Sequence, residues 1–234
     1  MKLPCYIFAS SKSWHIKKNY DEFSQKVNTT WFWVSSPDQL NETLKVIKPS
    51  YIFFLHWNWF VPSNIYSNFE CVCFHMTDVP YGRGGSPLQN LIIEGKKETQ
   101  LTALRMVEEM DAGPIYTKKK LSLEGRAEEI YIRAGDTSVE IIDWIIVNKP
   151  KPIPQVGEVT IFKRRKPDQS LLPNLGSLES IYDHIRMLDA PSYPFAFIEY
   201  GEFRIELNDA KIEGDKINAH VTIRKHPKNT RSSE

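Results

Sequence analysis

The sequence lacks a dominant charge of either sign. Its 234 residues include 30 Lys and Arg side chains against 29 Asp and Glu side chains, a formal net charge of +1. Proteins that bind nucleic acids or anionic membranes usually carry a marked basic excess or a basic patch. The balance therefore argues against a nucleic-acid partner and against a membrane partner.

Long apolar runs are also lacking. The run from Leu3 to Ala9 is short and contains Pro4, unlike the apolar segment of a secretory signal peptide. The run from Tyr51 to Pro62 is too short to cross a bilayer and carries His56 and Asn58. We therefore expect a cytoplasmic protein.

Cysteine is scarce, with three residues in the chain. Cys71 and Cys73 lie two apart in an extended run, so their side chains point to the same face of a strand. A lone Cys-x-Cys lacks the second pair of ligands that a structural zinc ion needs. We expect thiols packed as small hydrophobic groups, with no disulfide and no metal.

Short runs rich in Phe, Ile, Val and Trp recur along the first part of the chain, separated by segments of helix-plus-loop length. This alternation predicts an α/β fold with a mostly parallel sheet. The predicted strands are Cys5 to Ala9, Thr30 to Val34, Tyr51 to Leu55 and Glu70 to His75, followed by extended segments at 99–108 and 115–121. The predicted helices are 38–46, 63–68, 87–94, 127–133 and a further one after 137.

Two capping patterns support these helices. Ser86 can cap a helix, Gln89 can reach back to complete a capping box, and Gly95 suits the C-terminal end. A second box lies at 137–140, directly after Gly135. We therefore expect one helix to break at Gly135 and another to begin after it.

The proline-dense stretch from Lys149 to Pro154 cannot be helical and marks a boundary. We expect a core at 1–150, then a linker and a small α+β region at 151–234. The tail patterns predict a helix at 178–188, hairpin strands near 195–200, 202–207 and 217–223, and disorder at 226–234. The exposed hairpins could add to a partner's sheet in a homodimer.

The segment from Glu70 to Ser86 reads as a strand that ends in His75, a glycine-rich loop, and the start of a helix. In an open α/β sheet, ligands collect at the carboxyl ends of the strands, which places His75 where a catalytic group would lie. A structural histidine is an equally good interpretation of this position alone. Arg83 in the same loop is more often a solvated charge.

Three stretches in combination resemble the formyltransferase family that includes methionyl-tRNA formyltransferase and the sugar N-formyltransferases. They are Phe74 to Pro80, Gly84 to Pro87, and Met110 to Ile115. The resemblance implies a Rossmann-like, mostly parallel sheet with helices on both faces, plus a small C-terminal helix and β-hairpin region. It also implies N10-formyltetrahydrofolate as the formyl donor.

Residues 54–57, 75–90 and 155–160 are similar to the short N-formyltransferases of amino-sugar pathways, with those of pseudaminic acid synthesis as the best match. The implied acceptor is a UDP-linked 4-amino-4,6-dideoxy sugar. Two alternatives stay open: a formyltetrahydrofolate hydrolase of the same fold, and a non-catalytic module that binds folate or a sugar nucleotide. A tRNA acceptor is disfavoured by the balanced charge and by a tail that looks too short for that family's C-terminal domain.

By resemblance, His75 stabilises negative charge or moves a proton, and Asp111 positions it and accepts a proton from the amine. The family carries an asparagine two residues before the histidine, where this chain has Cys73. A thiol is a poor hydrogen-bond donor. Asn58 and His56 are the candidates to replace that asparagine, although a turn role for Asn58 is an equally good interpretation.

The resemblance and the residue chemistry assign two further sets. The predicted folate-binding residues are Trp59, Phe60, Val61, Arg83, Gly84, Gly85, Ser86 and Met110. The predicted acceptor-binding residues are His56, Trp57, Thr77, Asp78, Tyr81 and Arg164. Aromatic residues at a strand end are more often core, and the basic run 163–166 is more often a solvated surface. Residues 193–195 are expected to pack where the tail docks.

Overall fold

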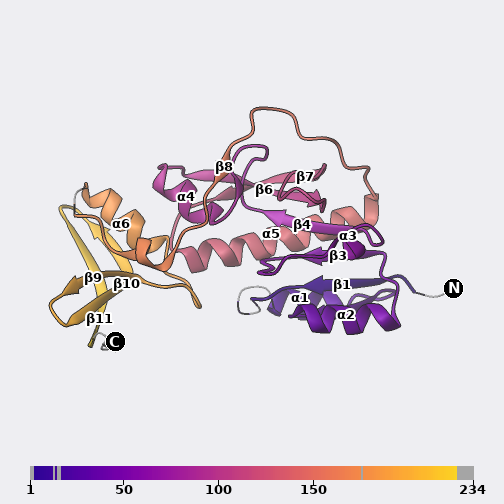
Figure 1. The fold of residues 1–234 in the computed structure, drawn as a ribbon, viewed down its shortest axis with the longest axis horizontal. Helices are drawn as coiled ribbons and strands as arrows, with labels where there is room; N and C mark the ends of the chain where they lie inside the picture. The colour runs from indigo at the N-terminus through magenta and orange to yellow at the C-terminus, as the bar shows by residue number, and fades with distance from the viewer. Residues whose placement is uncertain (1–2, 13, 15–16, 175, 226–234) are drawn as a thin grey trace, which may run out of the picture.

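A computed structural model describes residues 3–12, 14, 17–174 and 176–225, and contains a central α/β body with a smaller module at one end (Figure 1). The strands of the central sheet are β1 (Cys5–Ala9), β2 (Thr30–Val34), β3 (Tyr51–Phe54), β4 (Cys71–His75), β6 (Glu98–Arg105) and β7 (Ile115–Ser122). The helices of the body are α1 (Lys17–Ser24), α2 (Pro37–Val46), α3 (Ser63–Tyr66), α4 (Pro87–Ile93) and α5 (Ala127–Asn148).

The six-stranded sheet has the order β2-β1-β3-β4-β6-β7. Strands β2, β1, β3 and β4 are parallel, whereas β6 is antiparallel to both β4 and β7. Ile7 and Ile52 face a core that includes Leu40 of α2, while Phe8 and Phe53 face a core that includes residues of α1, α4 and α5. The predicted α/β fold, mostly parallel with helices on both faces, is confirmed.

The predicted helix break at Gly135 is wrong, because α5 runs without interruption past it. Thr137 and Ser138 do not start a new helix, since their hydroxyls donate to carbonyls one turn earlier, at 2.9 and 2.7 Å. A glycine inside a helix costs about 1 kcal/mol relative to alanine. Burial of Ile141 and Ile145 outweighs that cost.

The predicted capping box at α4 is also wrong. Ser86 adopts a left-handed backbone, with a φ of 52°, and its hydroxyl accepts a hydrogen bond from the Arg165 N–H at 3.1 Å instead of capping the helix. Gln89 is buried and donates to the Tyr131 hydroxyl at 3.3 Å and the Met187 carbonyl at 3.1 Å. Both side chains therefore form hydrogen bonds with residues far away in the chain instead of capping the helix.

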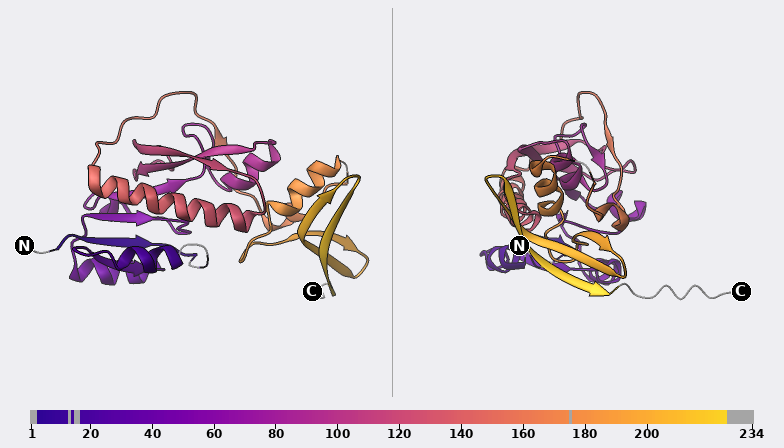
Figure 2. Two further views of the ribbon diagram at one scale, coloured as in Figure 1. Left: turned by 180° about the vertical axis from the view of Figure 1, so that it is seen from behind. Right: turned by 90° about the vertical axis from the view of Figure 1, so that its left-hand side faces the viewer.

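After α5 the chain arcs over the body and descends to the smaller module (Figures 1 and 2). On the way, β8 (Ile161–Phe162) pairs in parallel with β5 (Arg83–Gly84). The module contains a 3-10 turn (Pro167–Ser170), α6 (Leu178–Arg186) and an antiparallel sheet of β9 (Ala196–Tyr200), β10 (Phe203–Glu213) and β11 (Lys216–Lys225). The predicted helix and hairpins are confirmed, and the predicted disorder at 226–234 lies outside the described residues.

Buried polar contacts join the module to the body. Arg186 is 3% exposed and donates to the carbonyls of Leu123 and Gly125, at 2.6 and 2.8 Å. The Glu128 N–H donates to the Asp189 carbonyl at 2.9 Å. The tail is therefore fixed against the body, and the division at residue 150 stays a prediction. Within the described ranges, the helices are too short or too polar to cross a membrane.

Candidate active site

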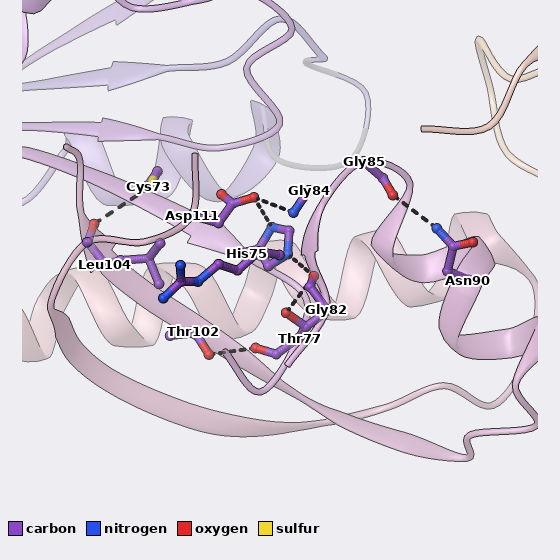
Figure 3. A network of polar contacts seen from close by, with 12 residues as sticks. Cys73, His75, Thr77, Gly82, Gly84, Gly85, Asn90, Thr102, Leu104 and Asp111 are labelled. Atoms are coloured by element: carbon purple, nitrogen blue, oxygen red, sulfur yellow. Dashed lines mark hydrogen bonds and ion pairs between the residues drawn. The ribbon is translucent and has the colours of Figure 1, made fainter. Parts of the chain in front are cut away.

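His75 is the last residue of β4, and its side chain is 8% exposed. Its Nε2 atom lies 2.8 Å from the carbonyl oxygen of Gly82 (Figure 3). A carbonyl oxygen only accepts hydrogen bonds, so Nε2 carries the hydrogen in this contact. Nδ1 is therefore the ring atom that is left to gain or lose a proton.

Asp111 faces that atom, with its Oδ2 3.5 Å from Nδ1 of His75. The same Oδ2 accepts the Gly84 N–H at 2.9 Å, so the carboxylate lies between the ring and the loop (Figure 3). A neutral ring with its hydrogen on Nε2 would present a lone pair to the carboxylate. A proton on Nδ1 would point at this carboxylate, so the pair is arranged to pass a proton between the ring and Asp111.

A buried polar network fixes the loop that carries Asp111. The Gln155 amide donates to the carbonyls of Asp111 and Gly113, at 2.7 and 2.8 Å. Its oxygen accepts two hydrogen bonds from Arg83, at 3.1 and 2.9 Å. Arg83 also pairs with Glu109 at 2.9 Å. Arg83 thus holds this loop in place. Local sequence did not predict this role for Gln155, because its hydrogen-bond partners all lie far away in the chain.

Close approach of β8 explains the glycines beside His75. Gly84 has a φ of 102°, and a Cβ there would lie 2.5 Å from the Phe162 carbonyl oxygen. A Cβ on Gly85 would lie 2.5 Å from Cβ of Arg164. Packing therefore requires both glycines, whatever ligand the cleft holds. Their predicted contact with folate stays a prediction.

These groups open onto a cleft of about 490 Å³. The predicted residues that line it are His56, Trp57, Asn58, Trp59, Phe60, Val61, His75, Gly84, Gly85, Ser86, Met110, Asp111 and Arg164. Trp59, Phe60 and Met110 are 44%, 75% and 67% exposed, which is unusual for large apolar side chains that sit together. They form an apolar rim suited to a planar ring.

Four predicted residues do not line the cleft. Thr77 is fully buried and donates to the carbonyl of Gly82 at 3.2 Å. Asp78 pairs with a lysine of β7 at 2.5 Å, and Tyr81 is hydrogen-bonded to a glutamate that follows α4. Arg83 belongs to the bracing network. Each of these side chains is engaged by the protein itself, and their contacts with ligands stay predictions.

Cys73, two residues before His75, also lines the cleft. Burial raises the pKa of its thiol far above the ordinary range, and the thiol points to the carbonyl of Leu104 at 3.7 Å. Cys71 and Cys73 pack against the same core cluster, as their strand spacing predicted. A neutral thiol directed at a neighbouring strand does not replace an amide donor. Asn58 is exposed and lines the same cleft.

An aromatic cluster at the cleft was missed in the sequence. The Tyr193 ring stacks on Tyr131 with centroids 5.3 Å apart, and the Lys12 ammonium lies 4.5 Å from the Tyr193 centroid. The His56 ring meets the Tyr131 ring edge-on at 5.0 Å. Burial, followed by the charge of Lys12, lowers the pKa of His56 to about 4. These residues come from four distant segments, and Tyr193 comes from the tail, so no local pattern could reveal the cluster.

A mostly parallel sheet covered on both faces, with a histidine–carboxylate pair and a cleft at the strand ends, defines an α/β enzyme fold with its active site at that edge. Residues 167–224 match the family profile of the methionyl-tRNA formyltransferase C-terminal domain. The structure of methionyl-tRNA formyltransferase from Clostridium thermocellum is 44% identical, with a TM-score of 0.92 over 95% of this chain and 100% of that chain. The chain belongs to the formyltransferase family of methionyl-tRNA formyltransferase.

Other relatives are more distant. Methionyl-tRNA formyltransferase of Bacillus mycoides (strain KBAB4) is 28% identical over 165 residues, which cover 67% of this chain and 52% of that protein. The chain thus spans about half the length of the curated relatives it matches. A 4-N formyltransferase from Francisella tularensis shares the fold, with 15% identity and a TM-score of 0.66 over 85% of this chain and 93% of that chain. The profile match at 167–224 corrects the argument that the tail is too short to resemble that C-terminal domain.

Proposed function

We propose that this chain transfers a formyl group from N10-formyltetrahydrofolate to a primary amine. The observation that carries the proposal is the His75–Asp111 pair, held at 3.5 Å on the wall of the cleft. Membership of the formyltransferase family supports the reaction class. A hydrolase of the same fold would use the same pair, with water in place of the amine.

The apolar rim is suited to hold the folate. Trp59, Phe60 and Met110 offer exposed apolar surface at the cleft. When bound, the folate supplies the formyl group carried on N10. The family resemblance assigns the same rim to the pterin ring.

We assign proton transfer to His75 and Asp111. The amine must lose a proton as it becomes an amide, and the departing nitrogen must gain one. Asp111 accepts the proton of the amine, and His75 takes part through Nδ1, which lies 3.5 Å from Oδ2 of Asp111. The pair then gives a proton to the departing nitrogen, while the Gly82 carbonyl holds the other side of the ring in place. Positioned acid–base groups of this kind contribute roughly 10²- to 10⁴-fold to a rate.

Asn58 is our choice for stabilising the charge that develops on the formyl oxygen. Its side-chain amide is a hydrogen-bond donor on the cleft wall, whereas the Cys73 thiol is directed elsewhere. Loss of one such donor lowers kcat by roughly 10²- to 10³-fold. We therefore expect Asn58→Ala to reduce turnover far more than the matched Cys73→Ala. Equal losses in the two variants would remove Asn58 from this role.

For the acceptor we propose an amino sugar linked to a nucleotide, such as the UDP-linked 4-amino-4,6-dideoxy sugar of pseudaminic acid synthesis. The similarity of residues 54–57, 75–90 and 155–160 to the amino-sugar enzymes supports it, as does the net charge of +1. Methionyl-tRNA is the second candidate. The 44% identical structure and the profile match of the tail favour it.

The test is to incubate the protein with N10-formyltetrahydrofolate and each acceptor class, following product mass and folate turnover. A formyl group gained by a UDP- or dTDP-linked amino sugar supports the first candidate, and one gained by methionyl-tRNA supports the second. Folate turnover without an acceptor would identify a hydrolase. Folate binding without turnover would leave only a binding module and refute the proposed activity.

A further inference from the structure

We propose that Lys12 and Arg164, which both line the cleft together with Tyr193, bind the diphosphate of a nucleotide-linked amine acceptor. This inference rests on the proposed function, because both side chains line the same cleft as His75 and Asp111. Lys12 follows β1, and Arg164 follows β8, so two distant segments supply the two charges. The sequence predicted Arg164 as an acceptor-binding residue. It did not point to Lys12, and it predicted only a packing role for Tyr193.

Lys12 is a partly buried cation that has an aromatic partner and no anionic one. Its ammonium lies 4.5 Å from the Tyr193 centroid, and no carboxylate in the described part of the chain lies within 4.0 Å of it. Burial lowers its pKa, which shows that its charge is incompletely solvated. An anion in the cleft would relieve that penalty, since a desolvated charge is stabilised mainly by an opposite one.

Arg164 supplies a second cation at the same place. Its backbone packs on Gly85, which fixes the origin of the side chain, and the side chain is exposed at the cleft. Tyr193 lines the same cleft as Arg164. A guanidinium offers two parallel donors to phosphate oxygens, and an ammonium adds a point charge.

The aromatic support under Lys12 is rigid. Tyr193 stacks on Tyr131, whose side chain is almost fully buried and whose hydroxyl accepts a hydrogen bond from Gln89 at 3.3 Å. His56, edge-on to the same tyrosine, is neutral near pH 7 because its pKa is about 4. Arg105, the third cation that lines the cleft, is paired with Glu70 at 2.5 Å, so the anion site depends on Lys12 and Arg164.

Charges within the cleft are separated. Its acidic side chains, Glu108, Glu109 and Asp111, all lie on the loop between β6 and β7, whereas the two lining cations that have no carboxylate partner among the described residues, Lys12 and Arg164, lie on other loops. This division suits an acceptor that is anionic at one end and carries an amine at the other. A nucleotide-linked amino sugar is such a molecule, with the diphosphate beside the cations and the amine facing Asp111.

Binding of UDP and of inorganic pyrophosphate to the full chain, measured by titration calorimetry, tests the site directly. Lys12→Met and Arg164→Gln remove one charge each while they keep most of the side-chain volume. Hydrogen bonds to charged groups are worth about 1.5 to 3 kcal/mol, so each variant should weaken UDP binding by roughly 10- to 100-fold. Lys163→Met is the matched control, because Lys163 is an exposed neighbour that does not line the cleft. Unchanged binding in both variants, or no binding of UDP by the wild type, overturns the inference.

A kinetic arm separates this inference from the proposed function. Each protein is given N10-formyltetrahydrofolate with a UDP-linked amino sugar or with the same amino sugar lacking phosphate. Lys12→Met should raise the KM for the UDP-linked acceptor, with kcat/KM for the phosphate-free sugar and the Kd for the donor unchanged. Absence of formyl product with the wild type and every acceptor is a failure of the proposed function. Product formed with equal KM by wild type and Lys12→Met, or product on methionyl-tRNA alone, overturns the diphosphate site.

Discussion

The substitution Asp111→Asn separates the chemical role of this side chain from its structural role. Asparagine has nearly the same shape, and its amide oxygen can still accept the Gly84 N–H that Asp111 accepts at 2.9 Å. It also tolerates the left-handed φ of 54° at this position, which alanine would adopt only with strain. Because the single atom Oδ2 makes both the Gly84 and the His75 contacts, an amide oxygen at that place still accepts the Gly84 N–H but cannot take up a proton from Nδ1. The loop geometry is kept and the proton transfer is lost.

The magnitudes follow from these contacts. Loss of a positioned acid–base group lowers turnover by roughly 10²- to 10⁴-fold, or about 3 to 5 kcal/mol in activation free energy. The fold keeps the same hydrogen bonds, with one of them no longer charge-assisted, so the free energy of unfolding should fall by about 1 kcal/mol or less. Asp111→Asn should therefore lower turnover strongly and the free energy of unfolding only slightly.

The assay is single-turnover formyl transfer, measured beside denaturant unfolding and donor binding. Glu109→Gln is the matched control, because Glu109 lies on the same loop, is 74% exposed and contacts Arg83. We expect the control to stay within a few-fold of the wild type. Near-normal turnover in Asp111→Asn would refute the reasoning about proton transfer, and so would a loss of turnover explained by unfolding.

Three further predictions concern the supports of the site. Gly84→Ala should lower the free energy of unfolding by about 1 to 3 kcal/mol more than Gly95→Ala. Both glycines have a positive φ, but only a side chain at position 84 would clash with Phe162, so equal losses would contradict this explanation. Gln155→Ala should lower kcat with little change in the donor Kd, since its amide fixes the loop carbonyls at 2.7 and 2.8 Å, and an unchanged kcat in stopped-flow assays would count against that role. Burial lowers the pKa of His56 from 6.5 to about 4, so the unfolded chain takes up the proton first and stability falls as the pH drops through that window. His56→Asn should flatten this decline in unfolding experiments between pH 7 and pH 4, and an unchanged slope would contradict it.

Local patterns predicted the sheet and the position of His75 because both depend on short-range chemistry. Alternating apolar residues specify strands, and a strand end followed by a glycine loop places a side chain at the ligand-binding edge. The same reasoning failed at Gly135, where burial of neighbouring isoleucines outweighs the weak helix propensity of glycine. It failed again at Ser86 and Gln89, whose hydrogen-bond partners come from distant segments.

Tertiary contacts account for the parts of the site that the sequence did not show. Arg83 was predicted to bind folate, yet it braces a loop through Gln155, a residue from the linker. Tyr193 was expected only to pack, yet it also lines the cleft beside Lys12. Pairings of this kind form when the tail docks on the body, so neither spacing nor composition predicts them.

The central claim is that the His75–Asp111 cleft moves a formyl group to an amine. The most direct measurement is the mass of a UDP-linked amino sugar and of methionyl-tRNA after incubation with N10-formyltetrahydrofolate, beside the amount of tetrahydrofolate released. We expect one formyl group on an acceptor for each tetrahydrofolate released by the wild type, and no transfer by His75→Asn, which still binds the donor. Tetrahydrofolate released without a formylated acceptor, or equal transfer by His75→Asn, would contradict the central claim.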